Sequence, residues 1–195
     1  MTTVGVLALQ GDFAEHAAIL QRLGVRCREV RLASDLDGLD ALIIPGGEST
    51  TITRLMAAFG LLQPLRSFAA LKPVWGTCAG MIVMAKHASD LDREGLDIMD
   101  IDVERNAFGR QVDSFECDLP ISEIPGETVR AVFIRAPLIR SVGPDVKVLA
   151  EIEGQGIVAA RQGHLLVTSF HPELTEDTRM HRYFLSYIDE PAAVK

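Results

Sequence analysis

The chain has 195 residues, of which 48% are hydrophobic and 24% charged, so it is long and apolar enough to bury a substantial core. Its formal net charge of −8 argues against nucleic acid or an anionic membrane as the main partner. No apolar run reaches the ~18 residues that a membrane span needs, and the start of the chain does not resemble a signal peptide. The cysteines, Cys27, Cys78 and Cys117, are too widely spaced for a disulfide framework or a metal cluster, which predicts a reducing, cytoplasmic location.

The first half of the chain alternates between apolar runs and amphipathic segments. The predicted strands are residues 4–9, 25–32, 40–44 and a fourth that starts at 72 and leads to Cys78. The predicted helices are 13–23, about 49–59, and 61–71. Asp12 is the expected N-cap of the first helix, and Ser49 or Thr50 that of the second. This alternation implies right-handed crossovers and a parallel sheet, with the more polar strand 25–32 near an edge.

The second half of the chain has shorter strands with alternating polarity. After a charged surface loop at 88–95, the predicted strands are 100–104, 112–119, 129–134, 146–152, 157–160 and a final buried strand at 165–170. A hairpin turn is expected at 154–156 and a last helix at about 175–188. We therefore expect one α/β domain spanning residues 1–195. It would be a three-layer sandwich with a mostly parallel central sheet and added antiparallel strands.

One cysteine lies in a glycine-rich turn between a strand and a helix. Gly76 and Gly80 flank Cys78 at two residues on either side, which is the G-x-C-x-G form of a nucleophile elbow. Small neighbours let the backbone bend sharply, and the start of a helix favours a thiolate. The run 81–85 has no polar residue, so the helix should be buried on most sides. The alternative is a buried structural cysteine in a tight turn.

A second glycine turn follows the predicted strand 40–44. Its sequence is Pro45-Gly46-Gly47-Glu48-Ser49-Thr50-Thr51. Ligands of open parallel sheets bind outside the carboxyl ends of the strands, so this turn is a candidate substrate or oxyanion loop. It is not a phosphate-binding P-loop, because the required lysine pattern is absent. A plain turn followed by a helix cap remains the alternative.

The chain has five histidines, and one of them lies at the end of a buried strand. The other four are His16, His87 and His181 on predicted helices, where surface or packing roles are expected, and His164 in a turn. His171 begins a His171-Pro172-Glu173 sequence in which a carboxylate lies beside an imidazole. Alone, this sequence indicates only a strand-ending turn. With the elbow in the same chain it predicts a nucleophile, a general base and an orienting acid.

Several blocks of sequence together resemble the class I glutamine amidotransferases, and among them the glutaminase subunits of pyridoxal 5'-phosphate synthases. The blocks span the chain: residues 7–11, 45–51, 76–80, 103–106, 108–116, 133–137 and 169–177. Met81 stands where leucine is common in the family, and the loop before Gly95 is variable. Neither difference falls on a functional position.

The resemblance implies hydrolysis of L-glutamine to L-glutamate and ammonia, with no metal or organic cofactor. Its implied catalytic residues are Cys78, His171 and Glu173, and its implied oxyanion-hole donors are the amides of Gly47 and Ala79. Its implied glutamine-binding residues are Gly47, Glu48, Ser49, Arg105, Ile134 and Arg135. An arginine suits an α-carboxylate because its donors form a fork, although without the resemblance surface ion pairs would be expected for both arginines.

The implied partner is the lyase subunit of pyridoxal 5'-phosphate synthase in a hetero-oligomeric complex, with residues 105–111 in part of the docking surface. Neither nucleic acid nor a membrane is an expected partner. Three alternatives are a glutaminase of another pathway such as imidazole glycerol phosphate synthase, a cysteine peptidase-like hydrolase on the same scaffold, and a non-catalytic binding subunit. Residues 109–116 argue against the first, and the intact Cys78, His171 and Glu173 argue against the last. Fold alone does not exclude the hydrolase.

Overall fold

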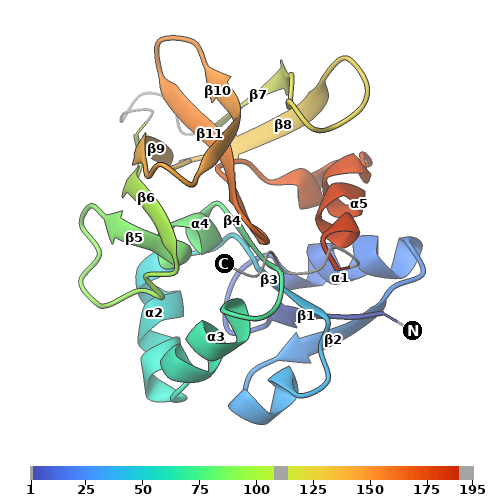
Figure 1. Cartoon of the computed structure of the whole chain (residues 1–195), viewed down its shortest axis with the longest axis vertical. Coiled ribbons are helices and arrows are strands. Elements are labelled where there is room, and N and C mark those ends of the chain that lie inside the picture. The colour runs from blue at the N-terminus through green and yellow to red at the C-terminus, as the bar shows by residue number, and fades with distance from the viewer. Residues whose placement is uncertain (1, 108–113, 189–195) are drawn as a thin grey trace.

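A large mixed sheet runs through the centre of the protein (Figure 1). The computed structural model describes residues 2–107 and 114–188. Five neighbouring strands of the sheet run parallel, in the order β2-β1-β3-β4-β12. They are β1 (Thr3–Leu7), β2 (Arg26–Val30), β3 (Ala41–Ile44), β4 (Val74–Thr77) and β12 (Leu165–Thr168). The predicted parallel core is therefore confirmed, with the polar strand β2 at its edge.

The antiparallel strands extend the sheet on the other side of β12, in the order β11-β9-β6-β5, with β10 also paired to β11. They are β5 (Ala85–Ala88), β6 (Met99–Glu104), β9 (Leu138–Val142), β10 (Lys147–Ile152) and β11 (Gly156–Gln162). Strand β5 is the exception, because it pairs parallel with β6. A separate antiparallel pair is formed by β7 (Ser114–Leu119) and β8 (Val129–Ile134).

Helices cover both faces of the parallel strands (Figure 1). One face carries α1 (Phe13–Arg22) and α5 (Arg179–Ser186), and the other carries α2 (Ser49–Ala58), α3 (Leu62–Ala69) and α4 (Ala79–Met84). Two short 3₁₀ segments complete the described elements, η1 (Ala33–Leu36) and η2 (Pro172–Leu174).

The core is divided into two layers by the alternation of side chains along the strands. In β3, Leu42 and Ile44 pack toward α2, α3 and α4, whereas Ala41 and Ile43 pack toward α1 and α5. All four side chains are fully buried, as expected for a parallel strand covered on both faces. This arrangement is the three-layer sandwich that the sequence predicts. Among the described residues, no helix has the length and apolar character to cross a membrane.

Several sequence predictions are wrong in detail. Strand β5 occupies a segment expected to end a helix and begin a loop, so His87 lies on a strand, and β9 was not predicted. The last helix begins at Arg179 instead of residue 175, since η2 and a loop occupy the preceding segment. The predicted strand 112–119, by contrast, is confirmed for Ser114–Leu119, and residues 112–113 lie outside the described residues.

Both predicted helix caps also differ from the structure. Asp12 stands at the N-cap of α1, but its side chain makes no capping hydrogen bond. The N-cap of α2 is Glu48, whose carboxylate accepts hydrogen bonds from the amides of Thr50 and Thr51. The Asp12 carboxylate therefore does not cap α1, and the Glu48 carboxylate caps α2 in place of Ser49 or Thr50. Both side chains line the same pocket.

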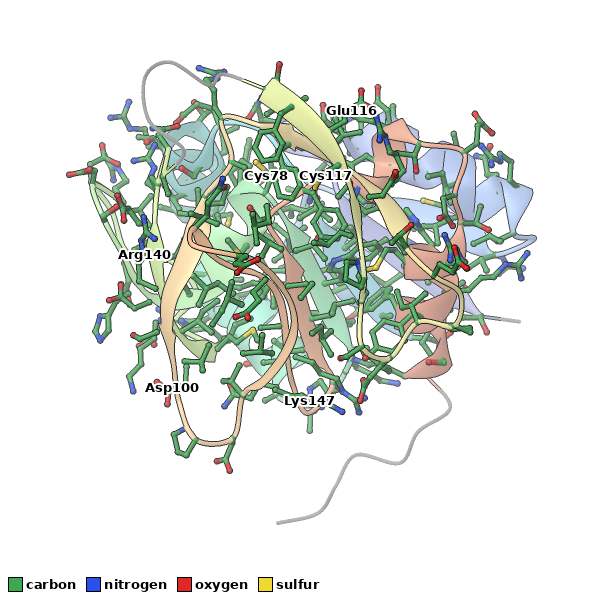
Figure 2. The ribbon with its side chains drawn as sticks, turned by 90° about the horizontal axis from the view of Figure 1, so that it is seen from above. Cys78, Asp100, Glu116, Cys117, Arg140 and Lys147 are labelled. Carbon is green, nitrogen blue, oxygen red and sulfur yellow. The ribbon has the colours of Figure 1, made fainter. Side chains whose placement is uncertain are left out.

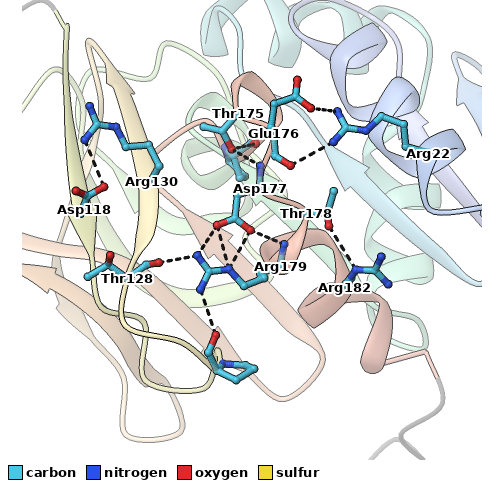
Figure 3. A network of polar contacts seen from close by, with 12 residues as sticks. Arg22, Asp118, Thr128, Arg130, Thr175, Glu176, Asp177, Thr178, Arg179 and Arg182 are labelled. Carbon is cyan, nitrogen blue, oxygen red and sulfur yellow. Dashed lines mark hydrogen bonds and ion pairs between the residues drawn. The ribbon is translucent and has the colours of Figure 1, made fainter.

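A polar network anchors the loop that follows η2 (Figure 3). Both carboxylate oxygens of Asp177 accept from Arg179, and Arg179 also donates to the carbonyls of Pro125 (3.2 Å) and Thr128 (2.6 Å). On the other side, Arg22 of α1 pairs with Glu176 at 2.9 Å. The loop is thereby tied to both α1 and the β7–β8 connection, which restrains the segment that leaves β12.

Candidate active site

Cys78 stands on a sharp turn at the carboxyl end of β4. Its φ of 47° and ψ of −103° are rare for a residue with a side chain. The turn needs glycine at both flanks: a Cβ on Gly80 would lie 2.0 Å from the carbonyl oxygen of Ile44, and one on Gly76 would lie 2.6 Å from Gly80. The amide of Cys78 donates to Thr168 at 2.8 Å. The side chain is 7% exposed and lies within the body of the molecule (Figure 2).

His171 and Glu173 follow β12, the strand that neighbours β4. The amide of His171 donates to Val132 at 2.8 Å, and Pro172 opens the short η2 turn. This turn brings Glu173 back onto the imidazole, where Nδ1–H of His171 donates to Oε1 of Glu173 at 2.7 Å. Cys78 lies close enough to the same imidazole to affect its pKa, and the two side chains line the same pocket. The three side chains predicted from the sequence are therefore brought together.

Asp12 adds a second carboxylate to this group. Its Oδ2 lies 3.3 Å from Nδ1 of His171, which explains why the side chain does not cap α1. Burial lowers the pKa of His171, but hydrogen bonds with Asp12, Cys78 and Glu173 outweigh burial and raise it to about 12. Burial raises the pKa of Glu173, and its bond with His171 opposes that rise. The site therefore favours an imidazolium, the form that stabilises a neighbouring thiolate.

The turn after β3 packs directly against the imidazole. A Cβ on Gly46 would lie 2.4 Å from Cε1 of His171. The carbonyl of Gly46 accepts from the amide of Asp12 at 3.1 Å, and the amide of Glu48 donates to Oε1 of Gln10 at 2.6 Å. Gly47, at a φ of 153°, is thus held between two contacts from the loop after β1. In a trans peptide the Gly47 N–H points opposite the Gly46 carbonyl, so in this structure these contacts hold the peptide in one of its two orientations.

A pocket of about 360 Å³ opens above Cys78. It contains every residue that the resemblance assigns to the site except Glu173, which is buried behind His171. The pocket is lined by Gln10, Asp12, Gly47, Glu48, Ser49, Cys78, Ala79, Ile82, Arg105, Asn106, Ile134, Arg135 and His171. Ala79 is the first residue of α4, so its amide has no acceptor within the helix. The size and polar lining of the pocket suit a small polar molecule.

The charged residues of the pocket are held in place by the backbone. Burial raises the pKa of Glu48, but hydrogen bonds from Thr51 and Thr50 outweigh it and lower the pKa to about 2. Arg105 lies 3.5 Å from Glu48 and also donates to the carbonyl of Asp90. Arg135 has a φ of 42°. Glu48 therefore remains ionised, and the pocket presents both charges that an amino acid zwitterion requires.

Sequence reasoning did not assign Gln10, Asp12, Asn106 and Ile82 to the pocket. Gln10 and Asp12 directly follow a predicted strand at the same sheet edge as Cys78, and that position was the available signal. The ligand atoms of Asp12, His171 and Glu173 lie within 4.8 Å of one another, a spacing that also suits a metal. We attribute the cluster to the triad, because Nδ1 of His171 is already bonded to Glu173. Most of the expected docking segment, 108–111, lies outside the described residues.

This sheet order, with a cysteine elbow at the end of β4, has the architecture of a class I glutamine amidotransferase. One solved structure, a crystal structure of a glutamine amidotransferase, has a TM-score of 0.89 at 49% identity and covers 95% of this chain and 98% of its own. A structure of PurLQS from Thermotoga maritima shares the fold at a TM-score of 0.66 and 14% identity, and the match covers 96% of this chain and 99% of the other. The chain belongs to the SNO glutamine amidotransferase family, whose model matches residues 6–190.

Curated relatives match over nearly their whole length. A pyridoxal 5'-phosphate synthase subunit PdxT from Roseiflexus castenholzii is 54% identical over 186 residues, covering 94% of this chain and 98% of the relative. The protein of the same name from Halalkalibacterium halodurans is 52% identical over 195 residues, covering 100% of this chain and 98% of the relative. The resemblance inferred from motifs is thereby confirmed at the level of the family.

Proposed function

We propose that this protein hydrolyses L-glutamine to L-glutamate and ammonia and delivers the ammonia to the lyase subunit of a pyridoxal 5'-phosphate synthase. The observation that carries the proposal is the grouping of Cys78 with the hydrogen-bonded pair His171 and Glu173, beneath a pocket with acidic and basic side chains. The named relatives support the choice of synthase. The resulting complex would contain both subunits and work in the cytoplasm.

The reaction follows from the positions of the side chains. The Cys78 thiolate attacks the side-chain carbonyl carbon of glutamine, and the carbonyl oxygen becomes an oxyanion. The amides of Ala79 and Gly47 donate to that oxyanion. His171, protonated and oriented by Glu173, gives its proton to the leaving amine, so that ammonia departs and a glutamyl thioester remains. Water then attacks the thioester with His171 as base, and glutamate and the free thiol are restored.

The binding groups place the amide over the nucleophile. Arg105 and Arg135 are assigned to the α-carboxylate, for which a guanidinium fork is suited. Glu48 is assigned to the α-ammonium because its carboxylate stays ionised. Gly47, Ser49 and Ile134 complete the walls around the substrate. No step of this reaction requires a metal or an organic cofactor.

A steady-state ammonia assay with free glutamine tests the proposal. The purified chain, mixed with the synthase lyase subunit, is expected to release equal amounts of ammonia and glutamate and to leave peptides intact. Cleavage of peptides without ammonia release from free glutamine would favour a cysteine peptidase-like hydrolase. Stimulation by a synthase of another pathway, and not by the pyridoxal 5'-phosphate synthase, would favour the other glutaminase.

A further inference from the structure

A row of buried polar side chains lies behind the triad, on the side away from the pocket. His16 of α1 is fully buried, and its Nδ1 lies 3.0 Å from Nε2 of His181 on α5. Its Nε2 faces two groups: Oγ1 of Thr77 on β4 at 3.3 Å and Oε2 of Glu173 at 3.4 Å. None of these contacts belongs to the substrate pocket, since His16, Thr77 and His181 do not line it.

The contact with Glu173 matters because this carboxylate has one satisfied oxygen and one that is not. Oε1 accepts from His171, whereas Oε2 has no hydrogen-bond partner among the described residues. The side chains of His16 and Glu173 are both 0% exposed. A buried carboxylate oxygen without a donor is costly. His16 Nε2 is the group positioned to donate to this oxygen.

The neighbours of His16 determine where its single proton lies. Burial lowers the pKa of His16 well below its usual value, and the charges of His181 and His171 act in the same direction. Burial, followed by the charge of Arg22, lowers the pKa of His181 to about 3. Both rings are therefore neutral, and each has one N–H. If Nε2–H of His181 donates to Nδ1 of His16, the proton of His16 must be on Nε2, facing Glu173.

We propose that His16 is a positioning residue whose Nε2–H, directed by His181, supports Oε2 of Glu173 and thereby orients His171 toward Cys78. The proposal rests on the proposed function, because it extends the same triad by two residues. The row runs from His181 through His16 and Glu173 to His171 and Cys78. Thr77 lies beside it as a second partner for His16, and the ring of Trp75 makes T-shaped contacts with the two buried imidazoles.

Removing the donor has a defined electrostatic consequence. Without His16, the Glu173 carboxylate has one fewer polar neighbour and its charged form is less stable. The imidazolium of His171 then loses part of its counter-charge, while Asp12 still faces Nδ1 at 3.3 Å. The thiolate of Cys78 therefore forms at higher pH. Substrate affinity should change little, since His16 does not touch the pocket.

The test compares His16→Leu, His16→Gln and Leu20→Ala. Leucine removes the donor, and glutamine restores an N–H at similar reach. Leu20 lies on the same helix and is also fully buried, so Leu20→Ala reproduces the packing loss without touching a polar group. The first readout is the rate of Cys78 alkylation by iodoacetamide as a function of pH, which requires no glutamine. The second is kcat and KM for glutamine with the synthase present.

We expect His16→Leu to move the midpoint of the alkylation profile upward by about one pH unit and to lower kcat about tenfold or more, with KM within about twofold. His16→Gln should restore most of the wild-type midpoint and most of the wild-type kcat. Leu20→Ala should lower the melting temperature without moving the midpoint of the alkylation profile. The same midpoint in His16→Leu and the wild-type protein would overturn the proposal. So would a folded His16→Gln protein that behaves like His16→Leu.

A further variant covers the case in which His16→Leu does not fold. His181→Leu leaves His16 in place but removes the group that directs its proton, so a smaller upward shift is expected, and no shift would count against the row. The two proposals fail separately. If the wild-type protein releases no ammonia but the alkylation shifts are observed, the function is wrong and the positioning role stands. If ammonia is released and the alkylation shifts are absent, the proposed function stands and the positioning role of His16 is wrong.

Discussion

Gly11 makes the closest backbone approach to the proposed oxyanion loop. It has a φ of 102°, and a Cβ at this position would lie 1.8 Å from the carbonyl oxygen of Gly46. Real Cβ contacts are essentially never shorter than 3.0 Å, so Gly11→Ala must move residue 11 and that carbonyl apart by at least 3.0 − 1.8 = 1.2 Å. The neighbours are backbone atoms and do not relax by rotating a side chain.

The displacement acts on the oxyanion donor. The Gly46 carbonyl and the Gly47 N–H belong to one peptide unit, so they move together. A misplacement of about 1 Å can cost ~10²-fold in rate, and loss of one oxyanion donor costs ~10²–10³. We therefore expect Gly11→Ala to lower kcat by ~10²–10³. Cys78 is on a different element, so its alkylation by iodoacetamide should continue.

Gly24→Ala is the matched control. Gly24 also has a positive φ, of 73°, but nothing lies within 4 Å of its Cβ position. Both variants carry the backbone strain of alanine at positive φ, and only Gly11→Ala disturbs the loop. The measurements are ammonia release at saturating glutamine with the synthase present, and thermal unfolding. Full activity in a folded Gly11→Ala protein would refute the placement of the oxyanion donor at Gly47.

Three further predictions follow from the same geometry. His171→Asn should lower kcat more than Glu173→Gln, since one group moves protons and the other orients it, and the double variant should lose less than the product of the two losses. Independent, multiplicative losses would contradict the triad. Arg179→Ala should lower the melting temperature by about 2–4 °C because the five side-chain hydrogen bonds of Arg179 are lost. Arg182→Ala, which loses one contact with Thr178, should change the melting temperature little (Figure 3). Equal decreases in the two variants would show that Arg179 does not anchor the loop. Adding the lyase subunit should raise glutamine hydrolysis at least ~10-fold by favouring the Gly46–Gly47 peptide orientation that presents an N–H. Equal rates with and without the lyase subunit would exclude partner gating.

The parallel half of the fold was predictable because four of its five strands, β1, β3, β4 and β12, are buried along their whole length. Residues 40–44 form an unbroken apolar run apart from Asp40, and such runs occur in sheets covered by helices. Strands β5 and β9 were missed because their sequences, AKHA and LIRSV, are short and mix exposed with buried residues. Their pairing with β6 and β11 is decided by distant segments, which local periodicity does not contain.

The differences at the two helix caps have a physical cause within the site. Asp12 is a good N-cap by residue type, yet the imidazole of His171 competes for its carboxylate. Glu48 displaces Ser49 and Thr50 as cap because its longer side chain reaches two amides of the first turn. Motif spacing therefore identified Cys78 and His171, the proposed nucleophile and base. The supporting carboxylates and the buried His16 depend on contacts between segments far apart in the sequence.

We expect this chain to take nitrogen from glutamine through Cys78 and to pass it to the synthase. Pyridoxal 5'-phosphate has one nitrogen atom, so glutamine carrying heavy nitrogen in its side-chain amide provides a direct measurement. With the wild-type chain and the lyase subunit, we predict heavy nitrogen in the product. With Cys78→Ala, the label should be absent, and adding an ammonium salt should restore product formation. Labelled product from the Cys78→Ala complex, or unlabelled product from the wild-type complex, would contradict the account.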